Sequence, residues 1–277
     1  MQGPIFGEVA ADRPGARMKE NVAEAVRSNP GILPLGLLEG TRLEGLERSF
    51  KLSAGSLLAD RYLLGVHKSA ISPAKLFGAC EQMGMPARFL SAIRERAEEA
   101  NAFHFGFEGS DSGGLYKVYL EFAQRLRPEG AAPVLLHLAY KWRVLDSSVA
   151  TIATYTCHPG LSVEAIAHRL ASTQTSDTAA AILRLAATRT AVPLMFLEVA
   201  EEGNPRASFD LNLHAAGIRI EEVRDVLVQA GARYGIPRER VDALYEGIKH
   251  RTLGHLSWGI NREGRDFLTV YYAVDRL

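Results

Sequence analysis

The sequence has few cysteines, no long apolar run and no excess of charge of either sign. Cys80 and Cys157 are its only cysteines, too few for a disulfide scaffold or a cysteine-rich zinc site. No apolar run approaches the length that spans a bilayer, and residues 1–17 contain no apolar signal core. Lys and Arg number 32 and so do Asp and Glu, whereas a protein that coats nucleic acid needs a positive surplus. We therefore expect a cytoplasmic protein that binds neither nucleic acid nor membrane.

The remaining composition is typical of a folded chain. Hydrophobic residues make up 47% and charged residues 23% of the 277 positions, which excludes an intrinsically disordered protein. No low-complexity tract or Pro/Gly/Ser-rich linker divides the sequence. We expect residues 1–277 to form a single domain, either as a monomer or as a weak homo-oligomer.

Five pairs of strand-like segments recur along the chain, and each pair is joined by a short turn. The pairs are 42–52 with 57–67, 101–108 with 115–122, 134–142 with 149–156, 193–200 with 207–214, and 253–260 with 266–274. Helical segments separate most pairs, at 73–101 (interrupted near 84–86), 162–172, 177–188, 220–235 and 237–250. The connection from 121 to 133 is the exception and has room for one short helix.

Hairpins separated by helix pairs favour antiparallel strands, because a parallel crossover needs one helix for each strand. Ten such strands leave two unpaired edges unless the sheet closes on itself. The predicted fold is therefore α+β: a closed ten-stranded antiparallel barrel of five hairpins, surrounded by helices.

Polar and apolar residues alternate along several of these strands. Lys117, Tyr119 and Glu121 alternate with apolar neighbours, and so do Asp210 and His214. Because the helices must cover the apolar face, the charged face is expected to line the barrel as a wet chamber for a polar ligand. The same alternation is also typical of an open sheet with one solvent-exposed face, which remains the alternative.

The predicted inner wall is rich in cations and tyrosines. The cations are Lys51, Arg61, Lys117 and Lys141, and the tyrosines are Tyr119, Tyr155 and Tyr271. Several cations in one chamber repel one another unless an anion neutralises them. A diphosphate suits this lining, since Arg, Lys and Tyr can all donate hydrogen bonds to its oxygens.

The repeat of hairpins and helix pairs resembles the ααββ barrel of aromatic prenyltransferases. Within that group, the motifs are similar to those of the cyanobactin-type peptide prenyltransferases. They are Glu47, Lys51 and Arg61 followed by Tyr62-Leu63-Leu64, then Phe105-Gly106-Phe107, then Lys117 and Tyr119, and finally Tyr271-Tyr272. Two features depart from that family: Glu121 stands where a second basic residue is frequent, and the segment 123–132 is short.

The resemblance implies transfer of a dimethylallyl or geranyl group from its diphosphate to a side chain of a ribosomal peptide, with Mg²⁺. By the motif match, Arg61 and Lys117 would bind the diphosphate, and Glu47 would hold or deprotonate the acceptor. Strand alternation adds further diphosphate-binding candidates: Lys51, Tyr119, Lys141, Tyr155 and Tyr271. The sequence has no Asp-rich DDxxD motif, so Mg²⁺ is expected to be held mainly by the diphosphate.

The nature of the acceptor stays open. Glu47, Glu121 and Asp210, with His214 as a further acceptor-binding candidate, would suit a cation such as arginine, while indole, imidazole and phenol acceptors also fit. Glu47 has a second interpretation, as a structural ion-pair partner of Lys51. Two alternatives to peptide prenylation remain: a small-molecule aromatic prenyltransferase on the same barrel, and a non-catalytic protein that binds a peptide or another partner.

Overall fold

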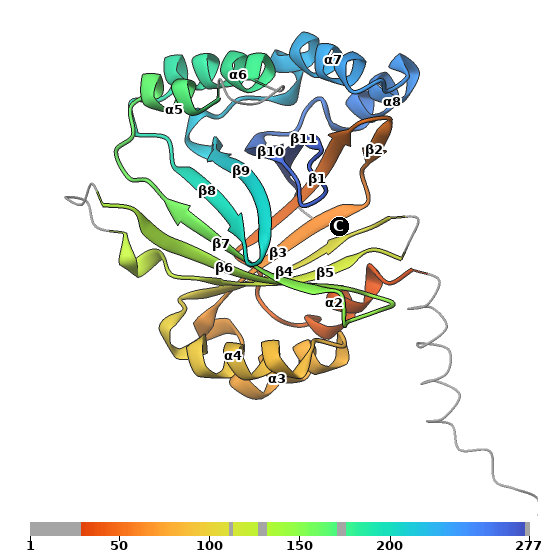
Figure 1. Cartoon of the computed structure of the whole chain (residues 1–277), viewed down its shortest axis with the longest axis vertical. Helices are drawn as coiled ribbons and strands as arrows, with labels where there is room; N and C mark the ends of the chain where they lie inside the picture. The colour runs from red at the N-terminus through yellow and green to blue at the C-terminus, as the bar shows by residue number, and fades with distance from the viewer. Residues whose placement is uncertain (1–28, 111–112, 127–131, 171–175, 275–277) are drawn as a thin grey trace, which may run out of the picture.

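The computed structural model describes residues 29–110, 113–126, 132–170 and 176–274, and its strands form one antiparallel sheet that closes into a barrel (Figure 1). The strands are β1 (Gly45–Ser53), β2 (Ser56–Leu58), β3 (Arg61–His67), β4 (Ala102–Glu108), β5 (Leu115–Glu121), β6 (Val134–Arg143), β7 (Ala150–Cys157), β8 (Phe196–Glu201), β9 (Asn204–Asn212), β10 (Leu253–Ile260) and β11 (Asp266–Ala273). Closure comes from β1 and β11, which pair from Glu47 opposite Ala273 to Ser53 opposite Phe267. The closed ten-stranded barrel is confirmed.

The predicted first hairpin differs in one detail. The segment expected as one strand over 57–67 is split into the three-residue β2, which pairs with the end of β1, and the longer β3. Strand β3 continues the barrel by pairing with β4, from Arg61 opposite Glu108 to His67 opposite Ala102. Because β11 occupies the other side of β1, the short β2 lies in line with β3, and the two are one strand interrupted at residues 59–60.

The two ends of the barrel differ in how they are connected. All five hairpin turns lie at one end, which we call the turn end, because each strand pairs antiparallel with the strand it is joined to. The helical connections lie at the other end, which we call the mouth, where β1 begins at Gly45 and β11 ends at Ala273. A chamber inside the barrel therefore has two distinct ends, the turn end and the mouth.

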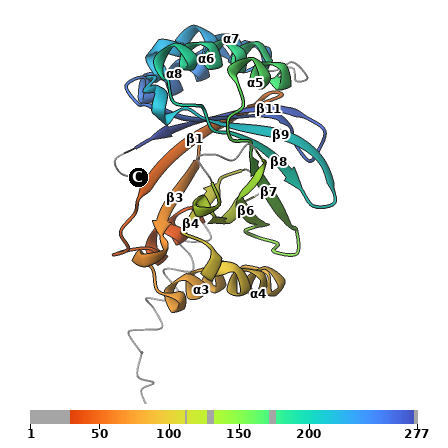
Figure 2. The same cartoon turned by 90° about the vertical axis from the view of Figure 1, so that its left-hand side faces the viewer.

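Helices cover two opposite sides of the barrel, as Figures 1 and 2 show. One side carries α2 (Ile32–Leu37), α3 (Pro73–Gln82) and α4 (Ala87–Arg96), and the other carries α5 (Val163–Leu170), α6 (Ser176–Arg189), α7 (Arg224–Arg233) and α8 (Arg238–Ile248). Short 3₁₀ turns are η1 (Lys68–Ala70), η2 (Ala97–Glu99), η3 (Ala123–Arg125), η4 (His214–Ala216) and η5 (Ile220–Val223). Within the described ranges, no helix is long and apolar enough to cross a membrane.

Between β5 and β6 the short connection expected from the sequence holds only η3 among its described residues. Residues 127–131 lie outside the described part of the chain. Gln124 and Arg125 of η3 bond to Glu99 beyond α4, which places this connection at the mouth.

Local sequence signals explain where the first helix pair begins and ends. The Ser72 hydroxyl accepts a hydrogen bond from the Lys75 amide at 3.2 Å, and Pro73 occupies the first helical position. The chain leaves α3 through Gly84, whose φ of 70° suits glycine. The pair is tied to the barrel by Trp142, whose indole N–H donates to the Met83 carbonyl at 2.9 Å.

The outer face of the barrel is apolar and the inner face is polar. On β5, Tyr116, Val118 and Leu120 are buried in a core that also contains residues of α3 and α4. The alternating positions Lys117 and Tyr119 line the interior cavity instead. The alternative of an open sheet with a solvent-exposed polar face is therefore wrong.

A matched pair of leucine substitutions tests the core. Leu256 of β10 is fully buried in the core shared with α5–α8, whereas Leu145 at a turn is 73% exposed. We expect Leu256→Ala to lower the free energy of unfolding by about 2–5 kcal/mol and Leu145→Ala by less than about 0.5 kcal/mol. Urea denaturation followed by circular dichroism measures both, and equal effects would contradict the assignment of the core to the outer face.

Candidate active site

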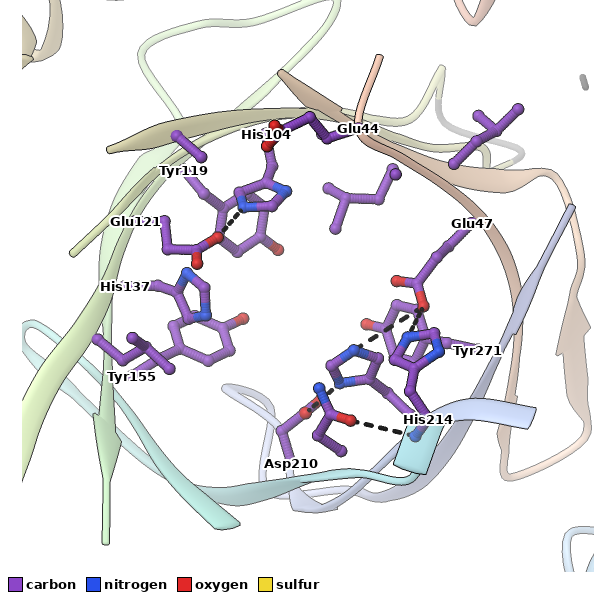
Figure 3. A pocket seen from close by; sticks show the side chains of 18 of the residues that line it. Glu44, Glu47, His104, Tyr119, Glu121, His137, Tyr155, Asp210, His214 and Tyr271 are labelled. Atoms are coloured by element: carbon purple, nitrogen blue, oxygen red, sulfur yellow. Dashed lines mark hydrogen bonds and ion pairs between the residues drawn. The ribbon is translucent and has the colours of Figure 1, made fainter. Parts of the chain in front are cut away.

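The barrel encloses a cavity of about 620 Å³ that reaches from the mouth into the interior. Glu44, Asn101 and Val274 line it beside the ends of β1, β4 and β11 at the mouth, and Arg61 and Lys117 line its deep end. Polar side chains from strands on every side of the barrel point into it (Figure 3). They form three layers, which differ in charge.

At the turn end, one carboxylate gathers three cations. Arg61 lies directly opposite Glu108 in the β3–β4 pair, and its Nη1 is 2.5 Å from Glu108 Oε1. Lys117 donates to Glu108 Oε2, and Lys51 Nζ lies 3.8 Å from Oε1. Arg61 Nε also donates to the Ser49 hydroxyl at 3.1 Å. The pKa of Glu108 is held well below its usual range, because these cations outweigh the effect of burial.

A second carboxylate at the same end gathers three more cations. Glu201 Oε1 is 3.1 Å from Lys141 Nζ, 2.6 Å from Arg206 Nη1 and 3.3 Å from Arg262 Nη2. The Glu201 side chain is fully buried, and its Oε2 has no hydrogen-bond partner among the described residues. Lys141 is directly opposite Lys117 in the β5–β6 pair, which makes the two clusters neighbours.

The two clusters together hold more positive than negative groups: six cations surround two carboxylates. Burial lowers the pKa of Lys117 to about 8, and Glu108 only partly opposes that shift. Burial and the nearby Arg206 lower the pKa of Lys141 well below its usual value. A bound anion would relieve both effects by stabilising the charged lysines.

Tyrosines form the middle layer. Tyr119, Tyr155 and Tyr271 point their hydroxyls into the chamber (Figure 3), and the rings of Tyr119 and Tyr155 are 5.7 Å apart. Burial raises the pKa of all three phenols, so they stay protonated and can donate hydrogen bonds. Lys141 Nζ lies 5.7 Å from the centre of the Tyr155 ring. The layer separates the turn end from the mouth with hydroxyl groups and aromatic faces.

At the mouth, one wall carries a linked group of two carboxylates and two histidines. Glu47 Oε1 is 2.9 Å from His214 Nε2 and 3.8 Å from His255 Nε2, and His255 Nδ1 is 2.9 Å from Asp210 Oδ1. Burial disfavours charge on His255, but Asp210 and Glu47 outweigh it and raise its pKa to about 9. His255 and His214 also lower the pKa of Glu47, against the effect of burial.

Gly254 makes this arrangement possible. A Cβ atom at position 254 would lie 2.5 Å from Glu47 Oε1 and 2.9 Å from the His214 ring. The Glu47–His214 pair therefore packs directly on the backbone of β10, and only glycine leaves room for it.

The opposite wall of the mouth carries a second, smaller group. His104 Nε2 is 2.6 Å from Glu121 Oε2, and the His137 ring lies 5.8 Å from the His104 ring. Burial lowers the pKa of His137 to about 3, and His104 adds to that shift, so His137 is neutral at neutral pH. His137 Nδ1 is buried and has no partner among the described residues.

Within each of the two mouth groups, two histidines and one glutamate lie close enough to share a metal ion. In each, three possible ligand atoms lie within 4.8 Å of one another, from Glu47, His214 and His255 in one group and His104, Glu121 and His137 in the other. These are the described residues that could hold a metal ion through nitrogen and oxygen. The hydrogen bonds and ion pairs within each group already occupy several of those atoms.

The structure brings together the residues that the sequence singled out. Glu108 is shared by Lys51, Arg61 and Lys117, and the adjacent cluster contains Lys141. The middle layer consists of Tyr119, Tyr155 and Tyr271. The mouth contains Glu47, Asp210, His214 and Glu121. Two expectations were wrong in detail. Glu47 pairs with histidines and not with Lys51. His214 is not a strand residue, since β9 ends at Asn212 and His214 begins η4.

Sequence reasoning gave no functional role to seven polar residues of the barrel interior: His104, Glu108, His137, Glu201, Arg206, His255 and Arg262. His104 and Glu108 alternate with Phe103, Phe105 and Phe107 on β4, so the rule that found Lys117 could have found them. Arg206 shares a face of β9 with Asp210, so the same rule could have found it as well. Glu201 follows a register shift in β8, and Arg262 lies in the turn between β10 and β11, where alternation carries no signal.

Comparison with known proteins finds similarity in structure only: no protein-family model matches the chain, and no curated protein matches its sequence. The apo form of the prenyltransferase PriB superimposes with a TM-score of 0.61 at 15% identity, over 91% of this chain and 90% of that chain. The 6-dimethylallyltryptophan synthase of Micromonospora olivasterospora gives 0.56 at 16% identity, over 83% and 82%. The 5-dimethylallyltryptophan synthase of Streptomyces coelicolor gives 0.57 at 14% identity, over 83% and 81%.

The chain therefore has the fold of the ααββ prenyltransferase barrel. The solved structures include a complex of PriB with L-tryptophan and dimethylallyl thiolodiphosphate, which has a TM-score of 0.60 at 16% identity. These neighbours confirm the barrel expected from the sequence. The narrower resemblance to the cyanobactin-type peptide enzymes finds no support among them.

The pKa of His255 yields a testable pH dependence. Because folding raises the pKa of His255 from its usual 6.5 to about 9, its contribution to stability is complete below pH 6.5 and is lost as the pH rises through about 9. We expect the His255 resonance in NMR to titrate near pH 9, and stability to fall between pH 7 and 9. Asp210→Asn should lower this pKa and weaken that fall. An unchanged pKa in the variant would contradict the Asp210–His255 pairing.

Proposed function

We propose that this chain transfers an allylic prenyl group from its diphosphate to a small acceptor bound in the barrel. The observation that carries the proposal is the turn end, where the six cations of the two carboxylate clusters converge inside the barrel beside Tyr119, Tyr155 and Tyr271. Solved neighbours with this fold include enzymes described as dimethylallyltryptophan synthases, which supports the same class of reaction here.

The residues divide the chemistry between the layers. Arg61, Lys117 and Lys141 would hold the diphosphate and stabilise the charge that develops on it as the allylic carbon–oxygen bond breaks. Tyr119 and Tyr155 would face the allylic cation and stabilise it through their ring faces. The barrel wall keeps bulk water from the cation, which would otherwise be quenched.

The acceptor would enter at the mouth and present its nucleophilic atom to the allylic carbon. Glu47 keeps its carboxylate ionised, since the pKa shift caused by its histidine neighbours opposes burial, so Glu47 can accept the proton that the acceptor loses. The role expected for Glu47 from the sequence, to hold or deprotonate the acceptor, is therefore part of this proposal.

A small-molecule acceptor is better supported than the peptide acceptor that was the first hypothesis from the sequence. L-tryptophan is bound in the PriB ternary complex, and dimethylallyl is the prenyl group in the names or ligands of several neighbours. A peptide side chain remains the second candidate, because the cavity extends to the mouth beside Glu44 and Val274. Geranyl diphosphate, the other donor expected from the sequence, remains the second candidate for the prenyl donor.

The turn end does not fit a magnesium ion held by the protein. Mg²⁺ prefers carboxylate oxygens, and the two carboxylates here, Glu108 and Glu201, are each surrounded by three cations. Lys141 and Arg206 hold the pKa of Glu201 near 2 despite its burial. The cations would repel a metal ion, so any Mg²⁺ that arrives with the donor would be held by the diphosphate.

Donor binding tests the proposal directly. Isothermal titration with dimethylallyl thiolodiphosphate should show binding, and Lys117→Ala should weaken it about tenfold or more through loss of a charge-assisted hydrogen bond. Arg61→Ala should behave similarly, whereas Lys68→Ala, at the surface beside Glu98, should leave the affinity unchanged. Unfolding curves show whether each variant is folded. No binding by the unaltered protein would favour a non-catalytic protein that binds a peptide or other partner.

Metal dependence gives a separate prediction. Because the cations of the turn end already oppose the charge of the donor, affinity for the thiolodiphosphate in excess EDTA should lie within about threefold of that with Mg²⁺. This difference corresponds to less than about 0.7 kcal/mol. A loss of binding in EDTA would show that a metal ion is part of the donor site.

A further inference from the structure

We propose that the acceptor carries a guanidinium group, which binds between the carboxylates of the mouth and is prenylated on nitrogen. This inference rests on the proposed prenyl transfer and names the class of its acceptor. It follows from the charge of the mouth, from the hydrogen-bond capacity left on its carboxylates and from what the mouth lacks.

The two ends of the cavity have opposite charge. Among the described cavity-lining residues, Arg61 and Lys117 are the only lysine or arginine side chains, and both lie at the turn end. The mouth is lined by four carboxylates, those of Glu44, Glu47, Glu121 and Asp210, and by histidines. A cavity of this polarity attracts a cation to the mouth and an anion to the turn end.

The carboxylates of one wall retain capacity to accept hydrogen bonds. Glu47 contacts its histidines through Oε1, and Asp210 contacts His255 through Oδ1. No described residue is found to donate to Glu47 Oε2 or to Asp210 Oδ2, and Figure 3 shows the second oxygen of Glu47 pointing into the chamber. Two carboxylates joined through one imidazole thus present two acceptor atoms to the same space.

A guanidinium group matches this arrangement better than an ammonium group does. Its N–H groups diverge in one plane and can reach two carboxylates at once, whereas an ammonium is a compact point charge. The planar ion can also lie against tyrosine rings, which Tyr119, Tyr155 and Tyr271 supply directly below.

The mouth is poorly suited to free tryptophan, which is bound in the PriB ternary complex. Tryptophan carries a carboxylate that needs a cationic partner, and the described residues of the mouth provide carboxylates and no lysine or arginine. The raised pKa of His255, caused by Asp210 and Glu47 against burial, adds one positive charge, but these two carboxylates already enclose it.

The allylic C1–O bond breaks and its electron pair leaves on the diphosphate at the turn end, while a guanidinium nitrogen forms a bond to C1. As the lone pair of that nitrogen forms the N–C1 bond, its N–H becomes acidic and the proton passes to the Glu47 carboxylate. The product is an N-prenylguanidinium ion, and the released diphosphate keeps the charge of the leaving group.

Four acceptor probes test the inference with the full chain and dimethylallyl diphosphate. Butylguanidine carries the proposed group alone, butylamine carries an ammonium of similar size, acetyl-arginine amide mimics a peptide side chain, and tryptophan is the indole control. Mass spectrometry should show a gain of one C₅H₈ unit on butylguanidine and on no carbon of tryptophan. Gain on acetyl-arginine amide at higher kcat/KM than on butylguanidine would identify a peptide as the source of the guanidinium.

Variants at the mouth should separate acceptor binding from donor binding. Glu47→Gln and Asp210→Asn should each raise the KM for butylguanidine about tenfold or more, because each removes a charged partner, and leave thiolodiphosphate affinity unchanged. Glu121→Gln on the opposite wall is a further variant if either of these fails to fold. Asp225→Asn, on the exposed surface of α7, is the matched control and should change neither.

The outcomes distinguish this inference from the function it rests on. Prenylation of tryptophan or butylamine with a kcat/KM equal to or higher than that of butylguanidine overturns the guanidinium acceptor. Prenylation of none of the probes, with intact thiolodiphosphate binding, overturns it as well. Neither outcome contradicts the donor site. Absence of thiolodiphosphate binding by the unaltered chain overturns the proposed prenyl transfer itself.

Discussion

Pairing of the first barrel strand with the last is the interaction on which the rest of the structure depends. The β1–β11 pair joins Glu47, Ser49 and Lys51 on one strand to Tyr271 and its neighbours on the other. Without it the sheet would have two open edges, and its polar face would meet solvent. With it, and with helices over the apolar outer face, the charged residues of every strand face one another across an interior from which water can be excluded.

Enclosure in the barrel strengthens the electrostatic effect of these charges. On an open surface, six cations beside two carboxylates would be screened by water and salt. Inside the barrel, burial lowers the pKa of Lys117 and Lys141, and a bound anion would oppose that shift by stabilising their charged forms. The carboxylates Glu108 and Glu201 hold those cations in place. The mouth, lined by carboxylates, has the opposite preference, and the tyrosine layer between the two ends is where a prenyl group would pass from one to the other.

Much of this could be predicted from sequence because a barrel strand alternates strictly between two environments. Alternation placed Lys117, Tyr119 and Glu121 on the inner wall, and turn signals placed the five hairpins. The partners of these residues could not be predicted, since contacts across strands depend on register: Arg61 meets Glu108 only because β3 and β4 pair in that frame. Arg262 acts from a turn without periodicity, and His214 reaches Glu47 from a 3₁₀ turn after its strand has ended. The repeat of hairpins and helix pairs predicted the barrel, whereas the acceptor depends on the mouth, whose side-chain contacts no repeat or motif predicts.

A crystal structure of the chain soaked with dimethylallyl thiolodiphosphate would test the central claim most directly. The account predicts both phosphorus atoms at the turn end, with their oxygens in hydrogen-bonding distance of Arg61, Lys117 and at least one of Lys141 and Arg206, and the dimethylallyl group against Tyr119 and Tyr155. Density for the diphosphate at the mouth, among Glu47, Glu121 and Asp210, or binding only outside the barrel, would contradict it.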